Sequence, residues 1–75
     1  MNQSPTEVTA AAVRVELARH QIRPSAIAKL LGRAPSTISR RLAGEYPFRV
    51  DELVAIAEHI GVPLSVLLPT EERAA

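Results

Sequence analysis

Residues 22–44, IRPSAIAKLLGRAPSTISRRLAG, decide the fold of this 75-residue chain. The stretch predicts two short helices joined by a turn, and the second helix ends in two arginines. Ala28 is small, so the two helices can approach closely, and Gly32 permits the left-handed backbone that turns one helix into the other. Apolar side chains stand at the positions that such a pair must bury, namely Ile27, Leu31 and Ile38. This pattern is typical of a helix-turn-helix.

The spacing of these residues resembles that of the Cro and lambda-repressor family of DNA-binding domains. The similarity continues through residues 46–68, YPFRVDELVAIAEHIGVPLSVLL, which look like the fourth helix and the short final helix of that family. It extends over residues 13–68 and does not depend on one short pattern. The resemblance implies that the chain binds DNA.

The first helix has a clear beginning. Ser4, Pro5 and Glu7 form the pattern of a capping box with proline at the first helical position, and they predict a helix over residues 5–20. Apolar residues then recur at helical spacing: Ala10, Val13 and Leu17.

Further helical segments are expected over residues 24–31, 35 to 42 or 43, 50–60 and 64–68. Alternating strand patterns are absent from the sequence. We therefore predict an all-α fold, a compact bundle of about five short helices, with helices 2 and 3 forming the helix-turn-helix. Residues 1–69 are expected to form this one domain, and residues 70–75, TEERAA, a short charged tail that frays. The predicted inward-facing residues include Ile27, Leu30 and Leu31 of helix 2, Phe48, and Val50, Leu53, Ile56, Ala57 and Ile60 of helix 4.

The composition allows one small aliphatic core. A chain of 75 residues has room for one domain, and its 47% apolar content is enough to fold it. The sequence contains no cysteine, so it offers neither a disulfide framework nor a thiolate metal site. The opening residues, MNQSPTEV, lack the pattern of a signal peptide, and no apolar run approaches the roughly 18 residues of a membrane span. We expect a cytoplasmic protein without membrane contact.

The net charge of +1 hides an uneven distribution. Residues 23–49 carry a net charge of +5, and the rest of the chain carries −4. Such a basic segment over the helix-turn-helix is the electrostatic footprint of a phosphate-binding face. The alternative is a solvated helix surface, which usually carries mixed signs. The basic residues of the segment are Arg23, Lys29, Arg33, Arg40, Arg41 and Arg49.

The resemblance implies that helix 3 lies in the major groove with its first half against the base edges. The residues that this places nearest the bases are Pro35, Ser36, Thr37 and Arg40. Arg40 has the most specific chemistry, because a guanidinium can donate two hydrogen bonds to O6 and N7 of guanine. The Thr37 methyl can meet a thymine methyl, although Ser36 and Thr37 are also ordinary residues for the first turn of a helix.

A second group of residues is expected to contact the DNA backbone: Arg23, Pro24, Ser25, Arg33, Ser39, Arg41, Tyr46 and Arg49. Arg33 and Arg41 stand where the motif is often apolar. Since neither should stabilise a core, phosphate attraction explains them better than folding does. Pro24 replaces a glutamine common at the start of helix 2 and leaves the helix N-terminus available to phosphate. Asp51 and Glu52 are expected to complement the start of helix 4 and not to hold a metal.

Three helix starts disregard the usual preference for a capping side chain. Arg23, Ala34 and Arg49 stand at or near the N-cap positions of helices 2, 3 and 4, where serine, threonine or aspartate is expected. Ser25 is the alternative cap of helix 2 if that helix starts one residue later. Broken local rules of this kind tend to mark functional surfaces.

These patterns predict a sequence-specific regulator of transcription that binds a double-stranded DNA operator. The resemblance narrows this to a phage-type repressor, Cro-like or an immunity-repressor domain, in a bacterial cytosol or a phage-infected host cell. A monomer or weak homodimer that pairs on DNA is expected. The alternative is an antitoxin-like protein-interaction module, for which an exposed apolar face at Val66, Leu67 and Leu68 would be the signal.

Catalysis has little support in the sequence. His20 and His59 lie near the ends of separate helices, and the motifs of metalloproteases, phosphate loops and serine hydrolases are absent. We expect no enzyme activity, no catalytic residues, no metal, no cofactor and no small-molecule substrate.

Overall fold

A computed structural model describes residues 3–69 of the chain. Its elements are α1 (Pro5–Arg19), α2 (Pro24–Leu31), α3 (Pro35–Leu42), α4 (Val50–Ile60) and the 3-10 helix η1 (Leu64–Leu67). No strand occurs within these described residues. The all-α prediction is therefore confirmed, with four α-helices and one 3-10 turn where about five helices were expected. The predicted tail at residues 70–75 lies outside the described residues.

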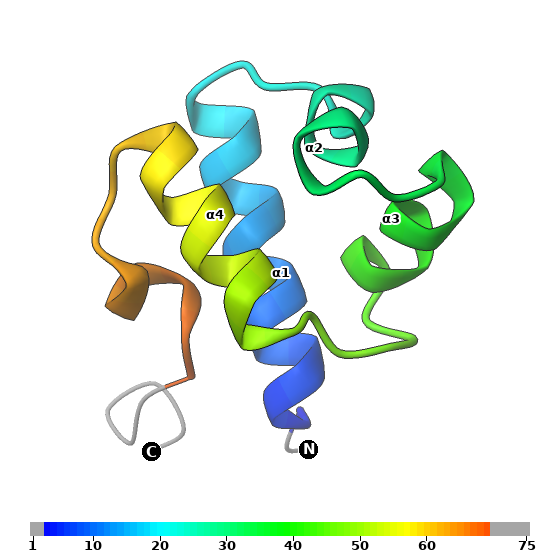
Figure 1. Ribbon diagram of the computed structural model, residues 1–75. Coiled ribbons are helices and arrows are strands. Elements are labelled where there is room, and N and C mark those ends of the chain that lie inside the picture. Colours follow the sequence, from blue (N-terminus) through cyan, green and yellow to red (C-terminus); the bar gives the residue numbers. More distant parts are fainter. Residues whose placement is uncertain (1–2, 70–75) are drawn as a thin grey trace.

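The helices are arranged with α2 and α3 on one side of the bundle and η1 on the other (Figure 1). Contacts join α2 to α3 and α4, and α1 to α3 and η1, while α4 also packs on η1. The loop between α3 and α4 returns the chain from the helix-turn-helix to the rest of the bundle (Figure 1). The helix-turn-helix thus packs on the rest of the bundle through α3 on α1 and through α2 on α4. Within residues 3–69, no helix has the length and apolar character to cross a membrane.

Local signals set the helix boundaries. The Ser4 hydroxyl accepts from the Glu7 N–H at 3.2 Å, and the Glu7 carboxylate accepts from the Ser4 N–H at 2.9 Å, which confirms the capping box. Three helices begin at proline, whose fixed φ suits the first helical position. Gly32 ends α2 with φ of 64°, the left-handed conformation that the turn requires.

The core is a single apolar cluster to which every helix contributes. Five of its side chains are fully buried, and each stabilises the fold by about 1.5–3 kcal/mol relative to exposure: Val13, Ile27, Ile38, Ile56 and Leu67. Phe48 is buried in the same cluster, as predicted. The predicted stripe of α1 is also buried, including Ala10 and Leu17.

Two residues predicted to face inward are exposed instead. Leu30 is 40% exposed because the packed face of α2 is centred on Ile27 and Ala28, and Leu30 falls on its flank. Val50, at the first position of α4, is 69% exposed, since Phe48 and Glu52 occupy that end of the interior. Both predictions were wrong for the same reason. Each extended the apolar side of a helix into its last or first turn, which the neighbouring helices do not cover.

Candidate nucleic-acid interface

The orientation of α3 is set by two buried side chains one turn apart. Ile38 is fully buried and Leu42 nearly so, and together they hold one side of α3 against the core. The opposite side carries polar residues. Of the predicted base-contacting residues, Pro35, Ser36 and Arg40 are exposed and Thr37 is half-buried, and Ser39 is exposed beside them. The structure thus brings these residues together on the outer face of α3, and base contact by them stays a prediction.

A small hollow of about 130 Å³ lies beside α3. It is lined by Thr37, Arg40 and Arg41 of α3 and by Tyr46 of the loop that follows. The structure therefore places a residue predicted to contact the DNA backbone next to one predicted to contact bases. Tyr46 is largely exposed, so its hydroxyl is accessible at this edge.

The far end of α3 is held by an arginine that sequence reasoning missed. Arg14 of α1 donates from Nη1 to the carbonyl oxygen of Leu42, the last residue of α3. The last carbonyls of a helix lack partners within it, and a cation there also complements the helix dipole. Because the two residues lie 28 positions apart, no local pattern points to this contact.

Glu52 of α4 is a buried carboxylate at the centre of an ion-pair network. Its side chain is 4% exposed and pairs with Arg41 of α3 at 2.5 Å and with Arg33 of the turn at 3.2 Å. The same carboxylate accepts the Arg49 N–H at 2.9 Å. Arg41 also donates to the Pro47 carbonyl at 3.2 Å. One carboxylate therefore ties α3, the turn before it and the start of α4 together.

This network corrects the expectation that Arg33 and Arg41 have no part in folding. A buried charge is costly unless it is paired, and both arginines neutralise Glu52. Glu52 was expected to complement the start of α4, which is one part of its role. The pairs were missed because they join residues 19 and 11 positions apart. Arg33 and Arg41, both predicted to contact the DNA backbone, are thus paired with Glu52 in the structure of the chain alone.

The network also changes the charge argument. Arg49 pairs with Asp51 at 3.4 Å, with both side chains largely exposed. Half of the six basic residues thus pair with Asp51 or Glu52, which lie just outside the basic segment. The described part of the chain, residues 3–69, gives no ion pair to the remaining three: Arg23, Lys29 and Arg40.

A second group of predicted residues lies near the start of α2. Arg23, Ser25 and Lys29 line a hollow of about 560 Å³ together with His59 of α4. None of the residues lining this hollow lines the one beside α3. The predicted backbone contacts therefore fall into two groups, one at the start of α2 and one around the end of α3 and the start of α4. Pro24 is exposed at the first of these.

The missing helix caps are confirmed. Arg23, Ala34 and Arg49 are the N-cap residues of α2, α3 and α4, and none makes a side-chain capping hydrogen bond. Pro24 is the first residue of α2, so Ser25 is not its cap. In α4 the Glu52 carboxylate provides half of a capping box by accepting from the Arg49 N–H. An arginine side chain has no acceptor with which to complete it.

The sequence pattern of the BetR domain matches residues 4–75 of the chain. The chain belongs to the BetR domain family. This is a family of small helical regulatory domains that resemble helix-turn-helix DNA-binding domains.

The fold of this BetR domain also occurs in a solved structure, the crystal structure of cobalt(II) HppE in complex with Tris buffer. The two superpose with a TM-score of 0.78 at 24% sequence identity, over 89% of this chain and 38% of that chain. The BetR domain thus spans well under half the length of that chain, and the likeness concerns the fold alone. No curated protein matches the sequence.

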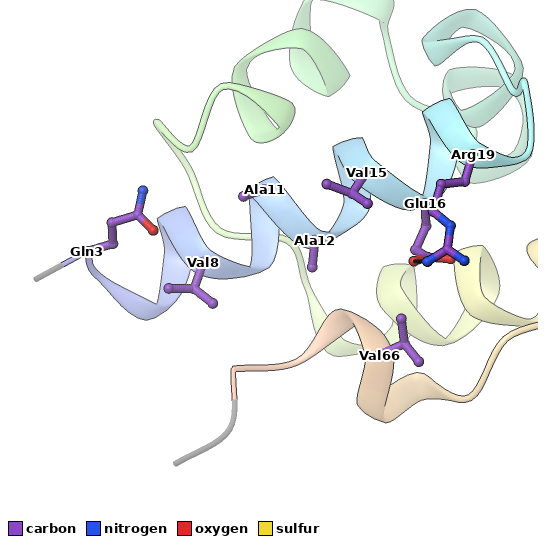
Figure 2. Close-up of a pocket in the computed structure, with 8 residues that line it drawn as sticks. All are labelled: Gln3, Val8, Ala11, Ala12, Val15, Glu16, Arg19 and Val66. Atoms are coloured by element: carbon purple, nitrogen blue, oxygen red, sulfur yellow. Dashed lines mark hydrogen bonds and ion pairs between the residues drawn. The ribbon is translucent and has the colours of Figure 1, made fainter. Parts of the chain in front are cut away.

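The BetR domain has a further surface feature along the outer side of α1 (Figure 2). An open groove of about 350 Å³ is lined by apolar side chains, with the Arg19–Glu16 ion pair at one end. Figure 2 shows Val66 of η1 facing this row across the groove. Leu67, whose exposure would have supported the interaction-module alternative, is fully buried. The apolar side chains of the groove are Val8, Ala11, Ala12, Val15 and Val66.

Proposed function

We propose that this BetR domain is a sequence-specific regulator of transcription that binds double-stranded DNA and reads the major groove with α3. The observation that carries the proposal is the exposed polar face of α3, held outward by Ile38 and Leu42. On that face Arg40 has no ion-pair partner among the described residues, so its guanidinium is available to a ligand. A helix of this kind enters the major groove with its first residues against the base edges.

Base readout is assigned to Pro35, Ser36, Thr37 and Arg40. Arg40 donates two hydrogen bonds to a guanine, a contact that discriminates against the wrong base by about 1–3 kcal/mol. Ser36 serves as donor or acceptor, while Pro35 contributes van der Waals contact. Thr37 lies deeper, beside Tyr46, where its methyl group suits a thymine methyl.

Backbone contact is assigned to the two groups that flank α3. Arg23, Pro24 and Ser25 approach one strand with the uncapped start of α2, whose free N–H groups favour phosphate. Ser39, Tyr46 and Arg49 approach the other strand. This division matches the way in which a recognition helix lies between the two phosphate rows of the major groove.

The proposed output is repression of the phage type, in which the domain occupies an operator and excludes the transcription machinery. Two copies would pair weakly on half-sites about 10 base pairs apart. The protein works in the cytoplasm and needs no cofactor, metal or enzymatic step. Operator binding and repression rest on the resemblance to Cro and lambda repressor together with the exposed face of α3.

Selection from a random-sequence DNA library, followed by titration at several salt concentrations, tests the proposal. The expected result is one enriched motif, with two copies about 10 base pairs apart if the domain pairs on DNA. The two cations assigned to the DNA backbone, Arg23 and Arg49, predict that log K falls with log salt at a slope of about −2 per copy. A slope near zero and no enriched motif would exclude DNA binding.

The groove along α1 favours a second candidate function, an antitoxin-like protein-interaction module. Its open apolar row is the kind of surface that binds a partner helix. Val15, the last apolar residue of this row on α1, is 53% exposed. A Val15→Glu variant separates the two functions, because it should block a partner protein while leaving affinity for DNA unchanged. Negligible binding to any duplex at low salt would favour the interaction module.

A further inference from the structure

We infer that Glu52 holds Arg33 away from DNA phosphates and thereby sets the sequence-independent part of the affinity for DNA. This inference rests on the proposed function. Arg33 lies in the turn that leads into α3, and its Nε donates to Glu52 Oε2 at 3.2 Å. A phosphate that recruits Arg33 must first replace this buried carboxylate as its partner. Glu52 is therefore a specificity-determining residue that does not itself touch DNA.

The two arginines are held to different degrees. Arg41 is 14% exposed and is fixed on two sides, by Glu52 and by the Pro47 carbonyl. Arg33 is 39% exposed and has Glu52 as its only ion-pair partner among the described residues. Arg33 is thus the one that can exchange its partner, whereas Arg41 stays with Glu52 as part of the packing between α3 and α4.

The charge balance determines the direction of the effect. Two arginines on one carboxylate leave a single net positive charge at this site, where the sequence alone suggests two free cations. Removing the charge of Glu52 frees Arg33 for a phosphate and adds about one counterion to those released on binding. The slope of log K against log salt should then steepen by about 1.

Glu52→Gln tests this directly, because glutamine keeps the shape and still accepts the Arg49 N–H while losing the charge. Binding is measured by fluorescence anisotropy on a 20-base-pair duplex of random sequence between 50 and 200 mM salt. The loss of affinity across this range should be about three- to fourfold larger for Glu52→Gln than for the parent. Glu58→Gln is the matched control, since it removes the same charge from an exposed site on the same helix and should leave the slope unchanged.

Arg33→Met completes the cycle. In the parent background it should leave the salt slope unchanged, because Arg33 is not on a phosphate. In the Glu52→Gln background it should restore the parental slope. Because Arg33 is exposed, the Arg33→Met variant should fold. It tests whether Arg33 contacts phosphate in the parent even if Glu52→Gln fails to fold.

Three outcomes would overturn the inference. If Arg33→Met alone lowers the slope by about 1, Arg33 already contacts phosphate in the parent. If Glu52→Gln is folded by circular dichroism and keeps the parental slope, or if Glu58→Gln steepens it equally, Glu52 does not withhold Arg33. If the parent binds no duplex at 50 mM salt, the proposed function fails, and the inference fails with it. If the parent binds DNA but Glu52→Gln keeps the parental salt slope, the inference fails while the proposed function stands.

Discussion

The start of α1 and the starts of α2, α3 and α4 are built differently. At α1, Ser4 and Glu7 bond each other's backbone in a complete capping box. At the other three helices, Arg23, Ala34 and Arg49 offer no side-chain cap, and two of these residues are cations that oppose the helix dipole. Each missing cap costs about 0.5–2 kcal/mol. The difference fits the proposed function, in which the starts of α2 and α4 face DNA phosphates.

The largest expected effect tests the outer face of α3. Arg40→Ala should weaken binding to the preferred operator by about 1–3 kcal/mol and relax base preference at one position. Its thermal stability should change little, because the side chain is exposed and has no ion-pair partner among residues 3–69. Titrations on the selected site and on random duplex measure both effects.

Lys29→Ala is the matched control for Arg40→Ala, since it removes one exposed cation from α2. It should weaken binding less and leave base preference intact. Equal losses on all sequences for Arg40→Ala would instead make Arg40 a phosphate contact.

The next effect tests the capped start. Ser4→Ala removes the hydroxyl that accepts the Glu7 N–H and should lower the free energy of unfolding by about 1 kcal/mol. In a domain of this size that corresponds to a fall in Tm of about 4–8 °C. DNA affinity measured well below Tm should remain that of the parent. A loss of affinity would mean that the start of α1 also faces DNA, so that the capped and uncapped starts would not differ in function.

A comparable effect of opposite sign is expected at α4. Arg49→Thr supplies the missing acceptor three residues before Glu52, which already accepts the residue 49 N–H. The exposed pair with Asp51 is lost, at little cost. Tm should rise by several degrees while DNA binding weakens without a change in base preference. Thermal melts measure the change in Tm, and titrations with duplex DNA measure the change in affinity. If Arg49→Thr binds DNA as tightly as the parent, Arg49 is a solvated surface residue.

The smallest effect is expected at α2. Arg23→Thr adds a cap, but the residue three positions later is Ala26, which cannot return a bond as Glu52 does in α4. The gain in stability should therefore be about 0.5 kcal/mol, at the low end for a cap. Binding should weaken, with a salt slope shallower by about 1. If Tm and affinity both match the parent, the start of α2 does not face the DNA backbone.

Much of the fold could be predicted because its signals are local. The capping box at Ser4, the left-handed Gly32 and the prolines that open three helices act within a few residues, where backbone geometry and hydrogen bonding are decided. The predicted helix boundaries agree with the structure to within about one residue. The outward face of α3 followed from the helical spacing of Ile38 and Leu42, which are both buried.

The tertiary structure alone decided which charges meet. Glu52 pairs with Arg33 and Arg41, and Arg14 reaches the end of α3, across sequence separations that no local pattern spans. It also decided that Leu30 and Val50 remain exposed. Helix periodicity indicates which side of a helix is apolar, but only the packing of neighbouring helices determines how far that side is covered. Ion pairs depend on the same packing, because they form where helix ends come together in space.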